Sequence, residues 1–177
     1  NPTMAEPAPK NDYVVGVDLG GTKILTGVFT QQLKSVGKTK ISTKPDRGAE
    51  AVIERVARCV NDAVDECDLT LKQIKGVGIG APGAVDAETG RVIFAPNLSW
   101  QNVALKKDLE RILGVPVFAE NDTNLSTPGV YHAELESKPR NMVGLCLGTD
   151  IGGGTMIACK PYTAERKHTR LNPSHRL

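Results

Sequence analysis

Apolar and polar positions follow two periods along the chain, and these predict strands and helices in a definite order. The segments YVVGVDLGG, KILTGVFT and KSVGKTKIST, which begin at Tyr13, Lys23 and Lys34, predict three consecutive strands. LGGT separates the first two, which predicts a hairpin with a glycine-rich tip. From Ala49 to Cys67 apolar residues recur at helical spacing, so an amphipathic helix is predicted there.

After this helix, apolar runs typical of buried strands alternate with helical segments. In chain order these are a strand over 74–83, a helix over 102–114, a strand over 115–121, a weaker helix over 123–135 and two strands within 141–160. Asn102 and Gly114 are the expected N-cap and C-cap of the helix between them. Three consecutive strands followed by alternating helices and strands indicate an α/β domain with a mixed sheet.

Composition and the N-terminal segment narrow the class of protein. Of the 177 residues, 40% are hydrophobic and 24% are charged, which is typical of a globular protein. No apolar run approaches the roughly 18 residues that a membrane helix needs, so no helical membrane span is expected. Residues 1–12 lack the apolar segment of a secretory signal and are expected to be disordered, with Met4 as the natural start. We therefore expect a cytoplasmic location.

The four cysteines, Cys59, Cys67, Cys146 and Cys159, are predicted to be core thiols. Their spacing contains no C-x-x-C pair and no Cys/His combination typical of a zinc site. Cys59 and Cys67 both fit the buried face of the predicted helix. Because free cysteine is commonly buried, this interpretation is favoured over disulfides or metal ligands.

The C-terminal segment 162–177 is more basic than the remainder of the chain. It carries Arg166, Lys167, Arg170 and Arg176 against the single acid Glu165. A basic tail can bind nucleic acid, but this one lacks the aromatic residues and the periodic pattern of a binding element. We interpret it as a disordered or non-native tail and expect no nucleic-acid partner and no membrane partner.

The segment DLGGTK, from Asp18 to Lys23, is the first candidate for chemistry. Two adjacent glycines let backbone amides approach an anion closely, because no Cβ intervenes. Thr22 adds a hydroxyl donor and Lys23 a positive charge, while Asp18 is suited to hold Mg²⁺ through water. The alternative is an ordinary tight hairpin, and this motif alone does not decide between them.

A second glycine turn, LGTDIGGG over 147–154, strengthens the case for phosphate binding. Two such turns between apolar runs suggest a site that grips a polyphosphate from both sides. No Walker A loop is present in the sequence. Gly78, Gly80 and Gly83 match the dinucleotide pattern G-x-G-x-x-G, but the residues after Gly83 predict a turn instead of a helix, which argues against dinucleotide binding.

Asp122 stands in the polar segment that follows the predicted strand 115–121. One interpretation is a helix N-cap, since aspartate is among the preferred capping residues. The other is a general base that accepts a proton from a substrate hydroxyl beside the phosphate-binding turns. The two roles are compatible, because a carboxylate has two oxygens.

Five motifs in order give a more specific signal. VGVDLGGTKI, GIGAPGAVD, APNLSW, LGVPVFAENDTNL and NMVGLCLGT-IGGG together resemble the ROK family of sugar kinases and sugar-responsive repressors, and most closely its bacterial ATP-dependent glucokinases. The resemblance covers roughly Tyr13 to Lys160. It implies a ribonuclease-H-like, actin/hexokinase-like N-terminal domain over 13–161, truncated before the second domain.

The resemblance also implies roles for individual residues. Asp122 would be the catalytic base, and the sugar would contact Asn97, Asn121, Asp122 and Gly83. ATP would be held by two phosphate loops, whose residues here are Asp18, Gly20, Gly21, Thr22, Lys23, Gly148, Thr149, Gly152 and Gly153. Asp18 would bind Mg²⁺ through water.

Some family features differ or are missing. The family's E-x-G-H sugar segment and cysteine-rich zinc motif do not occur in this chain. Asp150 stands where the second phosphate loop usually has glycine, and a carboxylate there would repel phosphate. Pro128 is expected to interrupt the helix after Asp122.

These features predict a part of a kinase that converts a hexose, most simply glucose to glucose 6-phosphate, with ATP and Mg²⁺. The chain alone is expected to be weak or inactive, and the complete protein is expected to form a homo-oligomer. The alternatives are a sugar-sensing transcriptional regulator of the same family and a degenerate relative that only binds ligand. The short segment before Tyr13 leaves no room for a helix-turn-helix domain, which favours the kinase.

Overall fold

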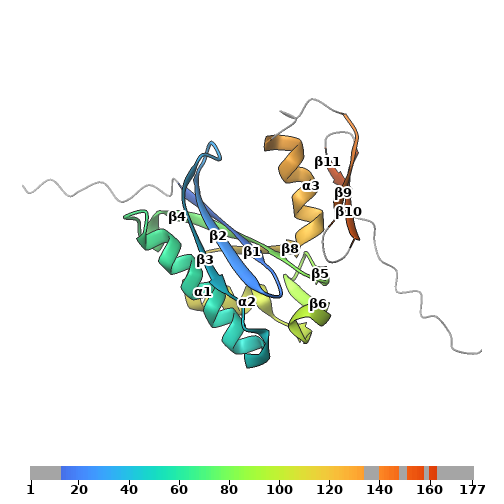
Figure 1. The fold of residues 1–177 in the computed structure, drawn as a ribbon. Coiled ribbons are helices and arrows are strands. Elements are labelled where there is room, and N and C mark those ends of the chain that lie inside the picture. The colour runs from blue at the N-terminus through green and yellow to red at the C-terminus, as the bar shows by residue number, and fades with distance from the viewer. Residues whose placement is uncertain (1–12, 134–139, 148–150, 158–159, 163–177) are drawn as a thin grey trace, which may run out of the picture. The chain divides into compact units, whose positions relative to one another are not determined.

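The computed structural model describes residues 13–133, 140–147, 151–157 and 160–162. The chain divides between Leu125 and Ser126 into two compact units (Figure 1). The predicted disorder of 1–12 and the predicted tail beyond Tyr162 lie outside the described residues. The prediction of one domain over 13–161 stays a prediction.

A five-stranded mixed sheet forms the centre of the first unit (Figure 1). Its strands are β1 (Tyr13–Leu19), β2 (Lys23–Thr30), β3 (Ser35–Ser42), β4 (Ile74–Ala81) and β8 (Val117–Asn121), in the spatial order β3-β2-β1-β4-β8. The β1–β2 and β2–β3 pairs are antiparallel, whereas β1–β4 and β4–β8 are parallel. The predicted hairpin and the mixed sheet are therefore confirmed.

Two helices cover one face of this sheet. Helix α1 (Ala49–Asp65) packs against β1, β2 and β3, and α2 (Leu105–Leu113) packs against β8 and α1 (Figure 1). Helix α1 follows the predicted apolar stripe and ends two residues before Cys67. The C-cap of α2 is confirmed, because Gly114 has φ 68° and donates its N–H to Glu110 O.

The predicted N-cap of α2 is wrong. Asn102 lies in strand β7 (Trp100–Val103) with φ 56°, and α2 begins only at Leu105, after Ala104. The Asn102 side chain instead accepts a hydrogen bond from the Arg91 guanidinium at 3.2 Å. A preferred capping residue therefore stands near the helix start, but this one belongs to a strand.

The core lies between the sheet and the two helices. In the middle of β1, β2, β4 and β8 alternate residues are buried, as at Val15, Val17 and Leu19 of β1. The fully buried large side chains include Leu19, Ile24, Val28, Val52, Val56, Ile79, Leu98, Trp100, Leu105 and Leu109. From Gly76 onward the residues of β4 that alternate with the buried Val77, Ile79 and Ala81 are all glycine, at positions 76, 78 and 80.

Strands β5 (Ala84–Asp86), β6 (Arg91–Ala95) and β7 form a second, three-stranded antiparallel sheet that the sequence did not predict. Strands of three to five residues are too short to show an alternating pattern. The 3₁₀ helix η3 (Pro96–Leu98) connects β6 to β7. Since a strand follows Gly83, the structure agrees with the absence of a dinucleotide-binding βαβ unit.

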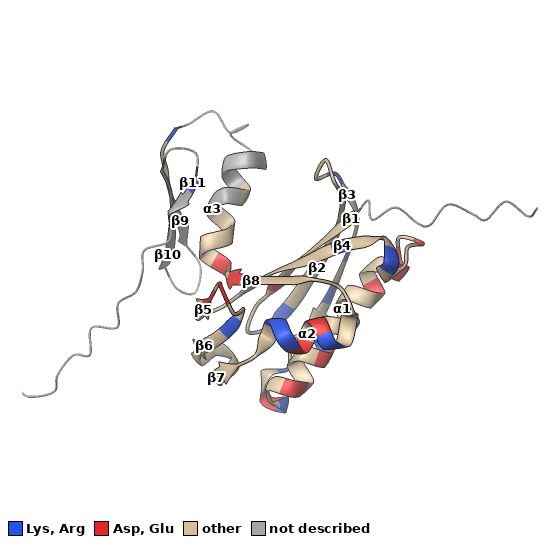
Figure 2. Cartoon of the chain, turned by 180° about the vertical axis from the view of Figure 1, so that it is seen from behind, with Lys and Arg blue, Asp and Glu red and all other residues tan. Residues whose placement is uncertain are grey.

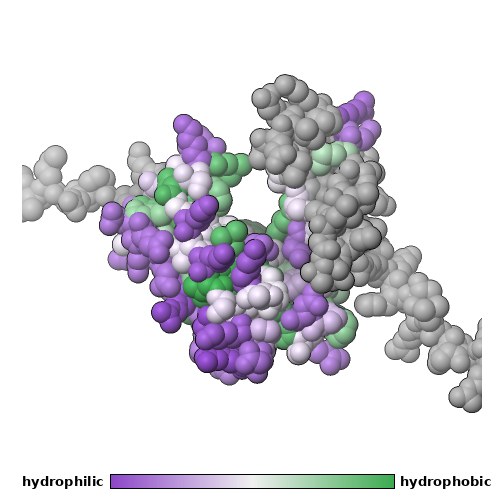
Figure 3. Space-filling model, viewed as in Figure 1, coloured by the Kyte–Doolittle hydropathy of each residue, from purple (hydrophilic) through white to green (hydrophobic). Residues whose placement is uncertain are grey.

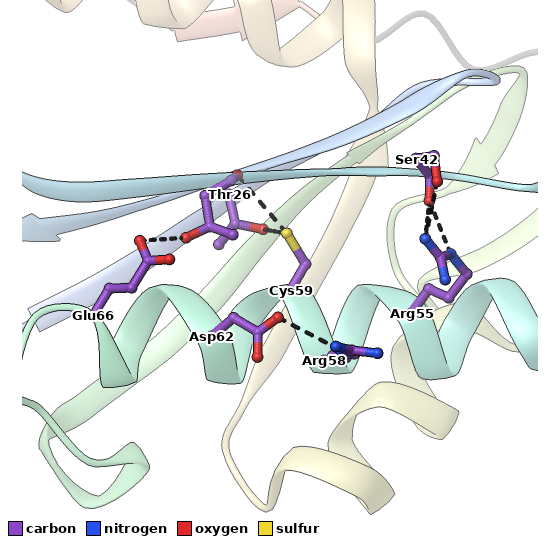
Figure 4. Close-up of polar contacts among 8 residues, drawn as sticks. Thr26, Ser42, Arg55, Arg58, Cys59, Asp62 and Glu66 are labelled. Carbon is purple, nitrogen blue, oxygen red and sulfur yellow. Dashed lines mark hydrogen bonds and ion pairs between the residues drawn. The ribbon is translucent and has the colours of Figure 1, made fainter.

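Polar contacts tie α1 to the sheet (Figure 4). The Arg55 guanidinium donates two hydrogen bonds to Ser42 O, at 2.6 and 2.8 Å, and holds the edge strand β3. The Thr26 hydroxyl donates to Cys59 Sγ at 3.3 Å. Cys59 is buried and Cys67 is half-buried, and both are free thiols. Burial raises the pKa of the Cys59 thiol. Hydrophilic residues gather on the outward side of α1 (Figure 3).

Helix α3 (Asp122–Ala133) begins at the end of β8, and three strands follow it: β9 (Met142–Leu147), β10 (Ile151–Ile157) and β11 (Lys160–Tyr162). The β9–β10 pair is antiparallel, as predicted, while β11 was not predicted. Helix α3 continues through Pro128 instead of ending there. No helix among the described residues is long and apolar enough to cross a membrane.

The packing of α2 can be tested by a matched pair of substitutions in that helix. Leu109 is fully buried, whereas Ile112 is 39% exposed. We expect Leu109→Ala to lower the free energy of unfolding by about 2–5 kcal/mol, because it leaves a cavity in the core. Ile112→Ala should cost less than about 1 kcal/mol. Urea denaturation measures both, and equal losses would contradict the packing described.

Candidate functional site

The ends of three parallel strands meet at one edge of the five-stranded sheet. Asp18 in β1 lies opposite Gly80 in β4, and Gly80 lies opposite Glu120 in β8. The next turn of chain begins α3 with Asp122, whose Cα lies 3.3 Å from the position that a Cβ on Gly80 would occupy. Acidic residues are visible at the junction of β8 and α3 (Figure 2). Asp18 and Asp122 therefore both lie next to Gly80, which has no side chain to separate them.

The pKa of Asp18 also reflects its closeness to Asp122. Burial raises the pKa of the Asp18 carboxyl above its ordinary value of 3.8, and the negative charge of Asp122 raises this pKa further. The ammonium group of Lys23 acts in the opposite direction. Two carboxylates and one ammonium group thus share one region at the sheet edge.

The glycine turn between β1 and β2 is closed by a hydrogen bond from Gly20 N–H to Lys23 O at 2.9 Å. Neither Gly20 nor Gly21 has a positive φ. Space favours glycine at both positions: a Cβ at Gly20 would lie 3.0 Å from Lys23 O, and one at Gly21 would lie 3.3 Å from both Asn97 Cβ and Asn97 O. The turn therefore packs against η3, which brings two predicted site segments together.

Thr43 is a part of the turn that the sequence did not reveal. It follows β3, is fully buried, and donates its hydroxyl to Gly20 O at 2.7 Å and its N–H to Thr22 O at 2.9 Å. A threonine as the last residue of the predicted strand 34–43 is the only signal in the sequence, and it is shared by many ordinary strand ends.

The start of α3 is capped by Asn121 and not by Asp122. The Asn121 Oδ1 atom accepts hydrogen bonds from the N–H groups of Thr123 at 3.1 Å and Asn124 at 3.2 Å. Asp122 is the first helical residue, and its Oδ1 accepts a bond from Thr123 N–H at 2.7 Å. The predicted capping role of Asp122 is therefore wrong. Asn and Asp are equally good caps, so sequence could not choose between these neighbours.

Asn121 also links α3 to the turn after β4. Its Nδ2 donates to Gly83 O at 2.7 Å. Gly83 has φ 84°, and a Cβ there would collide with Phe94 O and lie 2.9 Å from Ala95 Cα. This position requires glycine for both its conformation and its space.

The predicted site residues of the first unit, in order, are Asp18, Gly20, Gly21, Thr22, Lys23, Gly83, Asn97, Asn121 and Asp122. The structure brings them together in two linked groups, the glycine turn with Asn97 and the Asn121–Gly83 pair with Asp122. The charges of Lys23 and Asp122 both shift the pKa of Asp18, so Asp18 lies close to both groups. No cluster of three or more His, Cys, Asp and Glu that would hold a metal occurs within the part of the chain described.

The second predicted phosphate loop differs from expectation where it is visible. Gly152 and Gly153 lie within β10, opposite Cys146 and Leu145, and not in a turn. Gly148 and Thr149, together with Asp150, lie outside the described residues. The role of these residues in phosphate binding stays a prediction.

Asp18 gives a pH-dependent prediction. The folded chain holds this proton more tightly than the unfolded chain, so stability is lost as pH rises from about 3.8 through the higher folded pKa. Asp18→Asn should therefore be more stable than wild type at about pH 7 and show no advantage at about pH 3. Urea denaturation at both pH values measures the difference.

Asp86 provides a control of opposite sign. A hydrogen bond from the Thr89 hydroxyl lowers the pKa of Asp86, so its contribution to stability is present above the ordinary pKa and is lost as pH falls. Asp86→Asn should therefore lower stability at about pH 7 and not at about pH 3. A pH-independent effect of Asp18→Asn would contradict the assignment.

The double role of Asn121 predicts a graded loss of stability. Asn121→Ala removes the cap and the bond to Gly83 and should lower the free energy of unfolding by about 1–3 kcal/mol. Asn121→Ser keeps a cap acceptor and should recover roughly half of this loss. Asn124→Ala, whose side-chain amide donates to Glu120 Oε1 at 3.1 Å, is the control and should cost less. Equal losses for Ala and Ser at position 121 would show that the cap contributes nothing.

Comparison with known proteins gives matches along most of the chain. The glucokinase of Streptomyces coelicolor is 36% identical over 167 residues, which cover 90% of this chain and 50% of that protein. The xylose repressor of Caldicellulosiruptor bescii is 27% identical over 165 residues, which cover 90% of this chain and 41% of that protein. The chain therefore spans about half the length of the curated relatives it matches.

Solved structures give the same result. A ROK family glucokinase from Streptomyces griseus in complex with glucose and AMPPNP matches with TM-score 0.75 and 35% identity, over 85% of this chain and 46% of that one. A ROK hexokinase from Thermus thermophilus matches with TM-score 0.75 and 32% identity, over 87% and 50%. These matches confirm the predicted actin/hexokinase-like class of fold. A family model described as ROK family matches residues 14–170. The chain belongs to the ROK family.

Proposed function

We propose that the protein transfers the γ-phosphoryl group of ATP to a hydroxyl of a hexose, with glucose as the substrate. The observation that carries the proposal is the meeting of the glycine turn, Asp18 and Asp122 at one edge of the sheet. Support comes from the glucokinase of Streptomyces coelicolor and from the Streptomyces griseus glucokinase, whose structure contains glucose and AMPPNP.

In this proposal Asp122 is the general base. Its carboxylate accepts the proton of the sugar hydroxyl as that oxygen attacks the γ-phosphorus, and a positioned base contributes about 10²–10⁴-fold in rate. The cap made by Asn121 fixes the first turn of α3 and thereby the backbone of Asp122.

The sugar would contact Asn97, Gly83 and Asn121. An amide side chain both donates and accepts, which suits a hydroxyl. Asn121 has already committed its Oδ1 to two backbone N–H groups and one amide hydrogen to Gly83 O, so one amide hydrogen is left for a ligand. Asn97 would therefore provide the larger share of hydrogen bonding to the sugar.

The phosphates of ATP would lie at the glycine turn, where Gly20 and Gly21 leave room for backbone amides to approach. Thr22 and Lys23 are exposed there and supply a hydroxyl and an ammonium group. Asp18 fits the preference of Mg²⁺ for one or two carboxylates beside substrate phosphates, and it would hold the ion through water. Bound Mg²⁺ would neutralise charge on the transferred phosphoryl group. Gly148, Thr149, Gly152 and Gly153 would contribute from the second loop.

A sugar-sensing regulator is the second candidate, because the xylose repressor of Caldicellulosiruptor bescii matches over 90% of this chain. Such a protein would use the sugar contacts without phosphoryl transfer. The two functions differ in their need for Asp122, since only a kinase requires a base.

The test is glucose-dependent ADP formation from MgATP by the 177-residue chain and its variants. Asp122→Asn should lower the rate by about 10²–10⁴-fold because it removes the proton acceptor. Asp108→Asn, on the outer side of α2 in an exposed pair with Arg111, is the matched control and should leave the rate unchanged.

Two outcomes would contradict the proposal. Equal and measurable glucose-dependent rates for wild type and Asp122→Asn would show that Asp122 is not the base, and glucose binding without any ADP formation would favour the regulator. Because the chain spans about half the length of its relatives, we propose that it turns over well below the roughly 1–100 s⁻¹ of ordinary kinases. Rates in that range would refute this part.

A further inference from the structure

Thr43 contacts the glycine turn with both its side chain and its backbone. Its hydroxyl donates to Gly20 O at 2.7 Å, and its N–H donates to Thr22 O at 2.9 Å. The exposed fraction of Thr43 is 0%, which makes it one of two fully buried polar residues within the described part of the chain. A hydrogen bond shielded from water is electrostatically stronger than an exposed one.

The carbonyl that Thr43 holds belongs to the peptide between Gly20 and Gly21. A trans peptide is planar, so its C=O and its N–H point in opposite directions. With Gly20 O directed at the Thr43 hydroxyl, the Gly21 N–H is directed away from Thr43. Glycine on both sides of this peptide leaves its plane with the widest freedom to rotate. The Thr43 hydroxyl is the side-chain group that limits that rotation.

The other side of the turn is limited by packing. A Cβ on Gly21 would lie 3.3 Å from Asn97 Cβ and Asn97 O, so η3 lies close against this residue. The Gly20 N–H is occupied by Lys23 O. The bond from Gly20 N–H to Lys23 O thus closes the turn, and Asn97 packs against Gly21. The orientation of the Gly20–Gly21 peptide is then held by Thr43.

We propose that Thr43 is a positioning residue, which fixes the Gly20–Gly21 peptide and thereby aims the Gly21 N–H at a phosphate group of the nucleotide. The inference rests on the proposed function for the identity of the ligand. Thr43 itself touches no substrate. Its effect passes through the backbone of the turn, so it should alter nucleotide binding and leave sugar binding unchanged.

The chain offers a matched control for this effect. Thr26 is the other fully buried polar residue of the described part, and its hydroxyl donates to Cys59 Sγ at 3.3 Å, within the core and not to the turn. Thr43→Val and Thr26→Val make the same chemical change at the same burial. Thr43→Ser keeps the hydroxyl, and Thr43→Ala serves as its partner if the valine variant does not fold.

The experiment measures two properties of the 177-residue chain. The first is the ¹⁵N order parameter of the Gly21 amide without ligand, which should fall from about 0.85 to below about 0.6 in Thr43→Val and stay unchanged in Thr26→Val and Thr43→Ser. The second is the Kd for MgATP, which should rise by about 2-fold to 12-fold in Thr43→Val alone, the range that one net hydrogen bond gives. Glucose binding should not change.

Each outcome decides the proposal. An unchanged Gly21 order parameter in Thr43→Val, or in Thr43→Ala relative to Thr43→Ser, overturns it. Equal effects of Thr43→Val and Thr26→Val on nucleotide binding also overturn it, because they would reflect general loss of stability. If the wild-type chain binds no MgATP, the proposed function fails for this chain, and the order parameter alone then decides whether Thr43 fixes the peptide.

Discussion

Parallel pairing of β1, β4 and β8 is the constraint on which the rest of the first unit depends. Parallel strands end at the same edge of a sheet, so Asp18, Gly80 and Asn121 reach one place although the chain visits them far apart. The same arrangement forces crossover connections, and α1 and α2 serve as these connections while burying one face of the sheet. The core and the candidate site are therefore consequences of one pairing pattern.

Sequence patterns predicted the elements that are long or strongly periodic. The β1–β2 hairpin, α1 and the β9–β10 pair show enough repeats of their period to be recognised. The three-stranded sheet β5-β6-β7 was missed because each strand is stabilised by its neighbours and not by its own pattern. Asn102 was misassigned for a related reason, since its role depends on Arg91 in a strand that was not predicted.

The residue types of the candidate site could be predicted from the sequence, but the contacts that hold these residues in place could not. Glycines, Asp18 and Asp122 carry chemical signatures that sequence displays directly. The role of Thr43 depends on a 2.7 Å hydrogen bond to a distant segment, which no local pattern encodes. The cap is local, but Asn121 and Asp122 are equally good candidates for it by residue type. At Gly20 and Gly21 the preference for glycine comes from the closeness of neighbouring atoms and not from a positive φ.

The wide separation of Asp18 and Asp122 along the chain has a consequence for the order of folding. The β1–β2 hairpin and its glycine turn involve only local contacts and can form early during synthesis. Asp122 joins them only when β8 docks on β4, which closes a loop of about forty residues and carries an entropic cost. A nascent chain would therefore possess its β1–β2 glycine turn well before Asp122 reaches the sheet edge. Substitutions that slow the docking of β8 would delay assembly of the candidate site while leaving the hairpin intact.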